Sequence, residues 1–203
     1  MCPSRKVSTM GDSVTRPPER IKLTTVPQAL QGFTDSYCDL WRSQRASQPA
    51  STDLFGIPSP CIVESNDEQV FWLPEPFRPA QDLSAVERAM DITLRPEAHQ
   101  FYATQFAGDM EARHGELAMT LLQTWSADDF ERVQQNLIGH LVTQRRLRLS
   151  PTVFIATLES DLEVVSLCNL TGEVVLEKLG APSRTTLAPN LQEFLSSLIP
   201  VVR

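Results

Sequence analysis

The chain is poor in the residues on which metal centres and disulfide scaffolds depend. Its four cysteines form no C-x-x-C pair; they are Cys2, Cys38, Cys61 and Cys168. Scattered thiols of this kind favour reduced cysteines in a cytosol over a zinc site or a disulfide framework. No run approaches ~18 consecutive apolar residues, and the N-terminus has no apolar core like that of a secretory signal. We therefore expect a cytoplasmic protein that holds no metal or other cofactor and does not itself span a membrane.

Catalytic signatures are also missing. The three histidines form no H-E-x-x-H or H-x-H arrangement, and the chain has no Walker A, G-x-G-x-x-G or G-x-S-x-G motif. His140 falls on a predicted helix, where a partly buried structural imidazole is expected more often than a catalytic one. A carboxylate-dependent glycoside hydrolase stays a remote alternative, in which Trp72, Trp125 and Phe106 would floor a sugar cleft. Because these aromatics occur within apolar segments, core packing explains them better, and we expect no enzymatic activity.

Positive charge is scarce. Eighteen Lys and Arg residues against 25 Asp and Glu give a formal net charge of −7 and a pI near 5.0. Binding to phosphate backbones depends on clustered Lys and Arg, so nucleic acid is not expected as the partner. The one basic cluster is small: Arg145, Arg146 and Arg148. It is explained more simply by the C-terminus of a helix, whose dipole favours cations, than by a phosphate site.

Negative charge is concentrated in one part of the chain. Fourteen of the 25 acids lie between Glu64 and Glu131, where only four bases occur, so this window carries a formal −10. The segments before and after it carry +2 and +1. A like-charge excess destabilises a compact state and is usually spread over a surface. Its concentration here predicts a docking face for a basic partner.

Within this window, some acids have a local explanation and others do not. Glu87 and Asp91 are spaced to share a helix face and to repel each other by ~0.2–0.5 kcal/mol, which Arg95 can partly offset. Asp128 and Asp129 suit the first turn of a helix. Asp109 and Glu116, which flank a turn, have less local reason to be acidic. The predicted partner-binding residues are Glu87, Asp91, Asp109, Glu116, Asp128 and Asp129.

The length suits one domain, which we expect over residues 26–203. Residues 1–25 are polar, contain three prolines and carry five bases against two acids. They are predicted to form a disordered basic N-terminal tail. Order is expected to begin at Val26-Pro27, because proline suits the first turn of a helix. Apolar residues then recur at 3-and-4 spacing until the helix ends before Pro49.

Helices and strands follow without strict alternation. Ser84 and Glu87 are spaced as a capping box for a short helix, and Ser126 is placed to cap a long one. The expected strands are Cys61–Glu64, Gln69–Leu73, Leu117–Trp125, Thr152–Leu158, Leu162–Asn169 and Glu173–Glu177. The expected later helices are Ser84–Asp91, Pro96–Gln105, Asp128–Arg145 and Asn190–Leu198. This order predicts an α/β fold of the α+β type, with a mixed central β-sheet flanked by helices.

Several long blocks are distinctive as sequence. They are GIPSPC at 56–61, VERAMDI at 86–92, FYATQFAGDM at 101–110, MTLLQTWS at 119–126, DDFERVQQNLIGHLVTQRRL at 128–147, FIATLE at 154–159 and CNLTGEV at 168–174. Together they resemble the Syd family of SecY-interacting proteins, over roughly residues 26–200. The G-x-P turn, the Phe101-Tyr102 pair and the T-G-E-V strand start also resemble the wider SUKH superfamily.

The resemblance implies a SUKH-like single domain without catalytic activity. It also implies docking on SecY, the channel subunit of the Sec translocon, at the cytoplasmic side of the bacterial inner membrane, in regulation or quality control of SecYEG assembly. Because an acidic face is repelled by anionic lipid, we expect the chain to reach the membrane only peripherally, through SecY. Cytoplasmic loops of membrane proteins carry excess Lys and Arg. An acidic face would complement such loops and orient the complex. Other SUKH members resemble immunity proteins, so an alternative is the neutralisation of a basic toxin.

Overall fold

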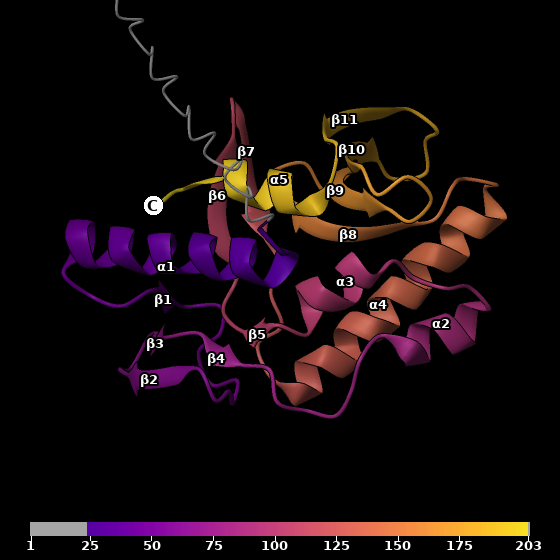
Figure 1. Cartoon of the computed structure of the whole chain (residues 1–203). Coiled ribbons are helices and arrows are strands. Elements are labelled where there is room, and N and C mark those ends of the chain that lie inside the picture. The colour runs from indigo at the N-terminus through magenta and orange to yellow at the C-terminus, as the bar shows by residue number, and fades with distance from the viewer. Residues whose placement is uncertain (1–23, 203) are drawn as a thin grey trace, which may run out of the picture.

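The computed structural model describes residues 24–202, in which five helices surround the strands of three sheets (Figure 1). The predicted tail of residues 1–25 therefore lies outside the described residues, except for Thr24 and Thr25. The helices are α1 Val26–Arg45, α2 Ser84–Met90, α3 Pro96–Tyr102, α4 Ala127–Arg146 and α5 Leu191–Ser197. In Figure 1, α1 lies beside α5, and α2 lies beside α4.

The main sheet has seven strands in the order β11-β10-β9-β8-β7-β6-β12. Their bounds are β6 Met110–His114, β7 Leu117–Leu121, β8 Thr152–Thr157, β9 Glu163–Cys168, β10 Val174–Lys178, β11 Arg184–Ala188 and β12 Ile199–Pro200. The predicted α+β class is confirmed. The sheet is not mixed as expected: all its pairings among the described residues are antiparallel. Short connections join most neighbouring strands, and antiparallel pairing permits such connections whereas parallel pairing requires long crossovers.

Two smaller sheets complete the described fold. β1 Ala50–Ser51, β3 Val70–Trp72 and β2 Ile62–Ser65 form a three-stranded sheet, and β4 Glu75–Pro76 pairs with β5 Gln105–Phe106. The hairpin of β2 and β3 is the one predicted from the sequence. The turn between these strands is closed by the Asn66 side chain, which accepts hydrogen bonds from the backbone N–H groups of Glu68 and Gln69 at 3.0 and 2.9 Å.

The first helix begins where the sequence predicts. Thr25 forms a capping box with Gln28: its hydroxyl accepts from the Gln28 N–H at 3.4 Å, and its own N–H donates to Gln28 Oε1 at 3.0 Å. Pro27 occupies the first turn. The helix ends at Ala46 in a left-handed conformation, and it buries Leu30 against the core. Capping and the apolar face thus define α1 locally.

The start of α2 differs from the prediction. Ser84 is not the cap, because the helix begins after Leu83, which makes no side-chain capping bond. The Ser84 N–H instead donates to Asp82 Oδ1 at 2.9 Å. Glu87 does not close a capping box; its carboxylate accepts from the Leu94 N–H at 2.7 Å. A contact of Glu87 with the connection between α2 and α3 therefore takes the place of the predicted capping box.

Six of the described strands were not predicted, namely β1, β4, β5, β6, β11 and β12, and the longest of them are β6 and β11. The segment preceding the 117–121 strand was interpreted as turn residues, but β6 lies there and pairs with β7 along its whole length. Similarly, β11 pairs with β10 at the edge of the sheet. In β11, polar residues mask the alternation of buried and exposed positions that normally identifies a strand, whereas β6 alternates buried Met110 and Ala112 with Glu111 and Arg113 and carries a strand signal in its sequence. Asp109 immediately precedes the β6–β7 hairpin, so the hairpin fixes the position of this carboxylate.

The core confirms the structural interpretation of the aromatics. Trp72 and Trp125 are 1% and 2% exposed, and their rings meet edge to face with centroids 6.5 Å apart. Phe106 is also buried. The Trp125 Nε1–H donates to the Ile57 carbonyl at 3.0 Å, so its polar group is satisfied within the fold. All three side chains are buried in the core, as expected from the apolar segments in which they occur.

The same aromatic cluster requires glycine at position 108. A Cβ added at this position would lie 2.7 Å from Cε2 of Trp72, which is nearer than such atoms normally approach. Trp72 also stacks on Tyr37, with ring centroids 6.2 Å apart, so it has little room to retreat. The backbone between β5 and β6 can therefore pass the indole only because residue 108 has no side chain.

We predict that Gly108→Ala lowers the free energy of unfolding by about 1–3 kcal/mol, because overpacking forces the Trp72 ring or the backbone to shift. Urea unfolding followed by tryptophan fluorescence would measure this change. Gly32→Ala is the control, because a Cβ at Gly32 in α1 would meet nothing within 4 Å. That substitution should stabilise the fold by about 0.5–1 kcal/mol through helix propensity. Equal stability of Gly108→Ala and the wild type would contradict the close approach.

Candidate functional site

Asp109 and Asp129 are brought together at one pocket. Asp109 immediately precedes β6, and Asp129 lies in the first turn of α4. Both line a pocket of about 190 Å³, together with Gln123, Trp125 and Arg132 among others. The β6–β7 hairpin and the N-terminus of α4 position the two carboxylates, although 20 residues separate them in the chain. We call this the Asp109–Asp129 pocket.

Asp129 is held firmly by its own helix. One carboxylate oxygen accepts from the Trp125 N–H at 2.8 Å, and the other pairs with Arg132 Nη2 at 2.8 Å. The Asp129 N–H donates to the hydroxyl of Ser126, which is the cap predicted from the sequence. Its side chain is 17% exposed. Asp129 is thus a preorganised carboxylate whose charge is partly balanced by Arg132.

The negative charge of Asp109 is balanced less well than that of Asp129. The Asp109 Oδ1 accepts from the Gln123 N–H at 2.7 Å, but no cation among the described residues forms an ion pair with it. Desolvation by the surrounding protein raises the pKa of Asp109 to about 6, and repulsion from Asp129 and Glu111 adds to the shift. Asp109 is nevertheless an exposed residue, so its carboxylate is open to a partner. A carboxylate of this kind gains most from a cation supplied by a partner.

Glu111 was not among the predicted residues. It lies on β6 two positions beyond Asp109, and its Oε1 accepts from the Thr120 hydroxyl on β7 at 2.9 Å. Side chains two residues apart in a strand point to the same face. Recognition of β6 in the sequence would therefore have placed Glu111 beside Asp109. The local negative charge comes from both the hairpin and α4.

The other predicted residues do not gather at this pocket. Asp128 is exposed next to Asp129. Glu116 is fully exposed in the β6–β7 turn, at the opposite end of the hairpin from Asp109, and pairs with Arg113 at 3.1 Å. Asp91 is the exposed left-handed residue that ends α2.

Glu87 and Asp91 belong to the opposite end of α4. The carbonyl of Met90, at the end of α2, accepts a hydrogen bond from Arg145 in the last turn of α4. A helix of 20 residues spans about 30 Å, so Asp91 and Asp128 adjoin opposite ends of it. The Glu87 Oε1 atom also lies 3.3 Å from His99 Nε2, within hydrogen-bonding distance. The predicted acids thus occupy three separate places.

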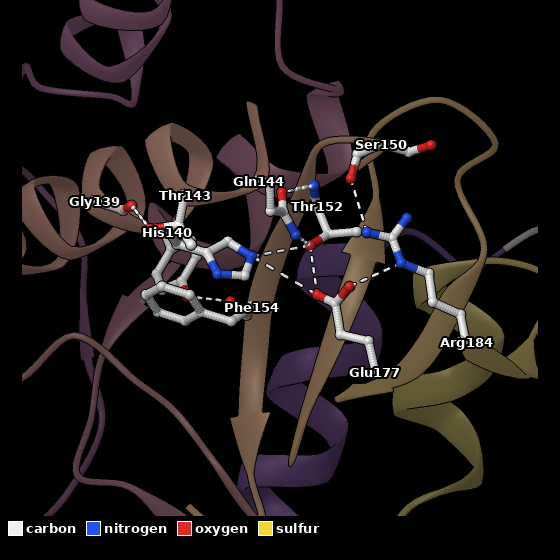
Figure 2. A network of polar contacts seen from close by, with 10 residues as sticks. Gly139, His140, Thr143, Gln144, Ser150, Thr152, Phe154, Glu177 and Arg184 are labelled. Carbon is white, nitrogen blue, oxygen red and sulfur yellow. Dashed lines mark hydrogen bonds and ion pairs between the residues drawn. The ribbon is translucent and has the colours of Figure 1, made fainter. Parts of the chain in front are cut away.

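A second cluster of charged groups is buried beneath the end of α4. Figure 2 shows His140 and Gln144 from α4 converging with Thr152 on Glu177, with Arg184 on the other side of the carboxylate. Glu177 is 3% exposed. It accepts from the Thr152 hydroxyl at 2.5 Å and from Arg184 Nε at 2.8 Å. His140 Nε2 lies 3.7 Å from the same carboxylate.

The cluster joins one helix to three strands. Gln144 bonds both the N–H and the hydroxyl of Thr152 on β8, at 2.8 and 2.5 Å. Arg184 on β11 also donates to the Ser150 carbonyl at 2.8 Å. Burial lowers the pKa of His140, the Arg184 charge lowers it further, and Glu177 opposes both. The structure places His140 in a structural network, in line with the interpretation made from the sequence.

Neither cluster has the composition of a metal centre. Among residues 24–202, no group of three or more His, Cys, Asp or Glu side chains is placed to hold a metal ion. The three cysteines in this range are buried and unpaired; they are Cys38, Cys61 and Cys168. No helix in the same range is long and apolar enough to cross a membrane.

Comparison with known proteins decides the family. The family model described as Syd protein (SUKH-2) matches residues 27–200. The chain belongs to the Syd family. The protein Syd of Cronobacter sakazakii is 60% identical over 177 residues, which cover 87% of this chain and 98% of that protein. The Syd proteins of Escherichia coli O157:H7 and Shigella flexneri are 59% and 58% identical over 175 residues, or 86% of this chain and 97% of each relative. The resemblance inferred from the sequence blocks is therefore confirmed.

We predict that Arg184→Met in this Syd-family fold lowers the free energy of unfolding by about 3–5 kcal/mol, because it leaves the buried Glu177 carboxylate without its cation. Chemical denaturation at neutral pH would measure the loss. Arg113→Met is the matched control, since the Arg113–Glu116 pair is exposed and such pairs contribute less than about 1 kcal/mol. Equal losses of unfolding free energy in the two variants would show that the buried ion pair contributes no more to stability than the exposed one.

The raised pKa of Asp109 predicts a pH-dependent stability. Between the unperturbed value of 3.8 and about 6, the folded state binds more protons than the unfolded state. Ionised Asp109 therefore destabilises the fold above about pH 6, and this effect disappears as the pH falls below about 4. Asp109→Asn keeps an acceptor for the Gln123 N–H and removes the charge.

Asp109→Asn should accordingly raise the melting temperature near neutral pH, and the gain should vanish below about pH 4. Thermal unfolding followed by circular dichroism across this pH range would test it. Asp161→Asn is the control, because Asp161 lies in an exposed turn between β8 and β9. A gain at Asp109 that is independent of pH would contradict the assignment.

Proposed function

We propose that this Syd-family chain acts as a binding protein rather than an enzyme, and that it docks on SecY at the cytoplasmic side of the inner membrane. The observation that carries the proposal is the Asp109–Asp129 pocket. It combines a preorganised carboxylate with a desolvated one that no described cation pairs with. A lysine or arginine from a basic cytoplasmic loop of SecY supplies the missing charge.

The geometry favours recognition of single basic side chains over broad electrostatic attraction. Asp128, Asp129 and Asp109 lie at one end of α4, where the positive end of the helix dipole favours negative charge. Glu87, Asp91 and Glu116 lie elsewhere and would meet other parts of a large partner. Exposed charges of this kind accelerate encounter and orient the complex more than they increase affinity. The Asp109–Asp129 pocket is therefore the predicted anchor.

The pocket suits a side chain better than a sugar. Its volume of about 190 Å³ is below the range of roughly 300–1,000 Å³ found for small-molecule sites. The hydroxyl of Tyr102, in the pocket wall, is not available to a sugar, because it donates to the Phe154 carbonyl at 2.5 Å. The carboxylates hence favour a role in binding over one in glycoside hydrolysis. A regulatory or quality-control role for SecYEG assembly would follow if docking depends on the state of the channel.

The test is binding of the purified chain to SecYEG in nanodiscs of neutral lipid, beside empty discs, across a salt series. We expect binding to the loaded discs only, weakening with salt because exposed charge pairs are screened beyond ~8 Å at physiological ionic strength. The double variant Asp109→Asn/Asp129→Asn should weaken binding at least about tenfold, equivalent to about 1.4 kcal/mol. Asparagine keeps a hydrogen-bond acceptor at both positions, and thermal unfolding would check the fold.

Glu159→Gln/Asp161→Asn is the matched control, because it removes the same charge from an exposed turn outside the acidic window. It should bind SecYEG like the wild type. If both double variants weakened binding equally, net charge and not the Asp109–Asp129 pocket would be the cause of the loss. Failure of the wild type to bind loaded discs would reject SecY as the partner, and protection of cells from a basic toxin would then be tested for the immunity-protein alternative.

A further inference from the structure

The C-terminal end of α4 carries a surface that the docking proposal does not use. The last two residues of α4 and the two residues that follow it are all exposed: Arg145, Arg146, Leu147 and Arg148. The three arginines form the densest group of cations in a chain whose net charge is −7. This surface lies at the opposite end of α4 from the Asp109–Asp129 pocket.

Exposed leucines gather around the same point. Leu147, Leu162 and Leu179 are 48%, 56% and 42% exposed, and they are three of the seven large apolar side chains exposed among the described residues. Leu147 and Leu179 line one pocket of about 230 Å³. The Leu179 N–H donates to the Leu162 carbonyl at 2.8 Å. Single exposed leucines are ordinary, whereas a cluster beside cations indicates a contact surface.

An apolar pocket adjoins the arginines on the other side. It has a volume of about 310 Å³, and Arg145 and Arg148 lie on it with Met90, Ile92 and Leu141. Leu149 lines both this pocket and the one between Leu147 and Leu179, so the two pockets adjoin at the helix end. The leucines, the two pockets and the three arginines together are called the α4 C-terminal surface.

The helix dipole alone does not account for this arrangement. It favours cations in the last turn, which explains Arg145 and Arg146. Arg148 lies beyond the helix with φ at 58°, a left-handed conformation that favours glycine. The Leu149 N–H donates to the Gln144 carbonyl at 2.9 Å and closes the helix end there. An arginine at a position suited to glycine is not required by the backbone.

We infer that the α4 C-terminal surface contacts an anionic phospholipid bilayer, with arginines on the phosphates and leucines entering the headgroup boundary. Cations next to exposed leucines are the composition of interfacial membrane-binding surfaces. The apolar component has no use in binding the backbone of a nucleic acid, and it distinguishes a bilayer from a purely electrostatic partner.

Acids limit this surface on two sides. Glu159 and Asp161 are exposed in the turn that precedes Leu162, and Glu163 faces Lys178 across β9 and β10. Asp91 follows Met90 at the rim of the apolar pocket. The contact is therefore centred on Arg146, Leu147 and Arg148, and it is weak and reversible, since a few basic residues and leucines do not anchor a protein stably.

The inference is tested by sedimentation of the full chain with protein-free vesicles, so it succeeds or fails independently of SecY binding. The vesicles are phosphatidylcholine alone or mixed with an equal part of phosphatidylglycerol. We expect binding to the mixed vesicles at low salt and none to phosphatidylcholine. Arg146→Gln/Arg148→Gln should weaken binding roughly 30-fold, since each arginine near an anionic surface contributes about fivefold.

Arg42→Gln/Arg45→Gln is the matched control. It removes two exposed arginines from the last turn of another 20-residue helix, α1, and so makes the same change in net charge, although Arg42 also pairs with Asp39. It should bind like the wild type after correction for net charge. Leu147→Ser should weaken binding without changing its salt dependence, because it removes only apolar contact.

Three results would overturn the inference. The first is no binding of the wild type to mixed vesicles at low salt. The second is equal loss in the two arginine double variants, which would reduce the effect to overall charge. The third is binding of a polyglutamate peptide, but not of vesicles, at the same arginines, which would assign the surface to an acidic protein.

Discussion

The buried carboxylate of Glu177 constrains the whole C-terminal half of the fold. A charge that is only 3% exposed must be paired and hydrogen-bonded, because an isolated carboxylate inside a protein is very unfavourable. Arg184, Thr152 and His140 satisfy it from β11, β8 and α4. These partners come from elements spread over more than 40 residues, so their convergence allows one arrangement of α4 on the sheet. Replacing such a pair by apolar residues is often neutral, whereas removing one partner leaves an uncompensated buried charge and is strongly destabilising.

With α4 fixed in this way, its two ends become separate surfaces. The N-terminal end holds Asp128 and Asp129 beside Asp109, where the helix dipole favours negative charge. The C-terminal end holds three arginines and exposed leucines. About 30 Å separates the ends. A chain with a net charge of −7 can thus present a local cationic surface, because charge at this distance is largely screened in salt. A partner with basic loops set in an anionic bilayer would meet both surfaces.

Elements with strong local signals could be predicted from the sequence. The α1 helix has a proline in its first turn and apolar residues along one face, and α4 has Ser126 as a cap with two acids behind it. The β2–β3 hairpin has a turn closed by Asn66. In contrast, β11 was missed because polar residues hide its alternation, and β6 was missed although Met110 and Ala112 alternate with Glu111 and Arg113. The Ser84 cap was wrong, because the helix begins after Leu83 and the Glu87 carboxylate accepts from the Leu94 N–H instead.

By itself, the sequence determined the family, the α+β class and the concentration of 14 acids in one window. Only the tertiary structure decided which of these acids meet. Asp109 and Asp129 come together because the β6–β7 hairpin folds back beside the start of α4. Asp91 and Glu116 remain apart from them, at the far end of α4 and at the hairpin turn. Antiparallel pairing reverses the chain every few residues, so neighbours in sequence are carried to opposite ends of the molecule. Proximity of charge along a chain therefore does not fix proximity in space.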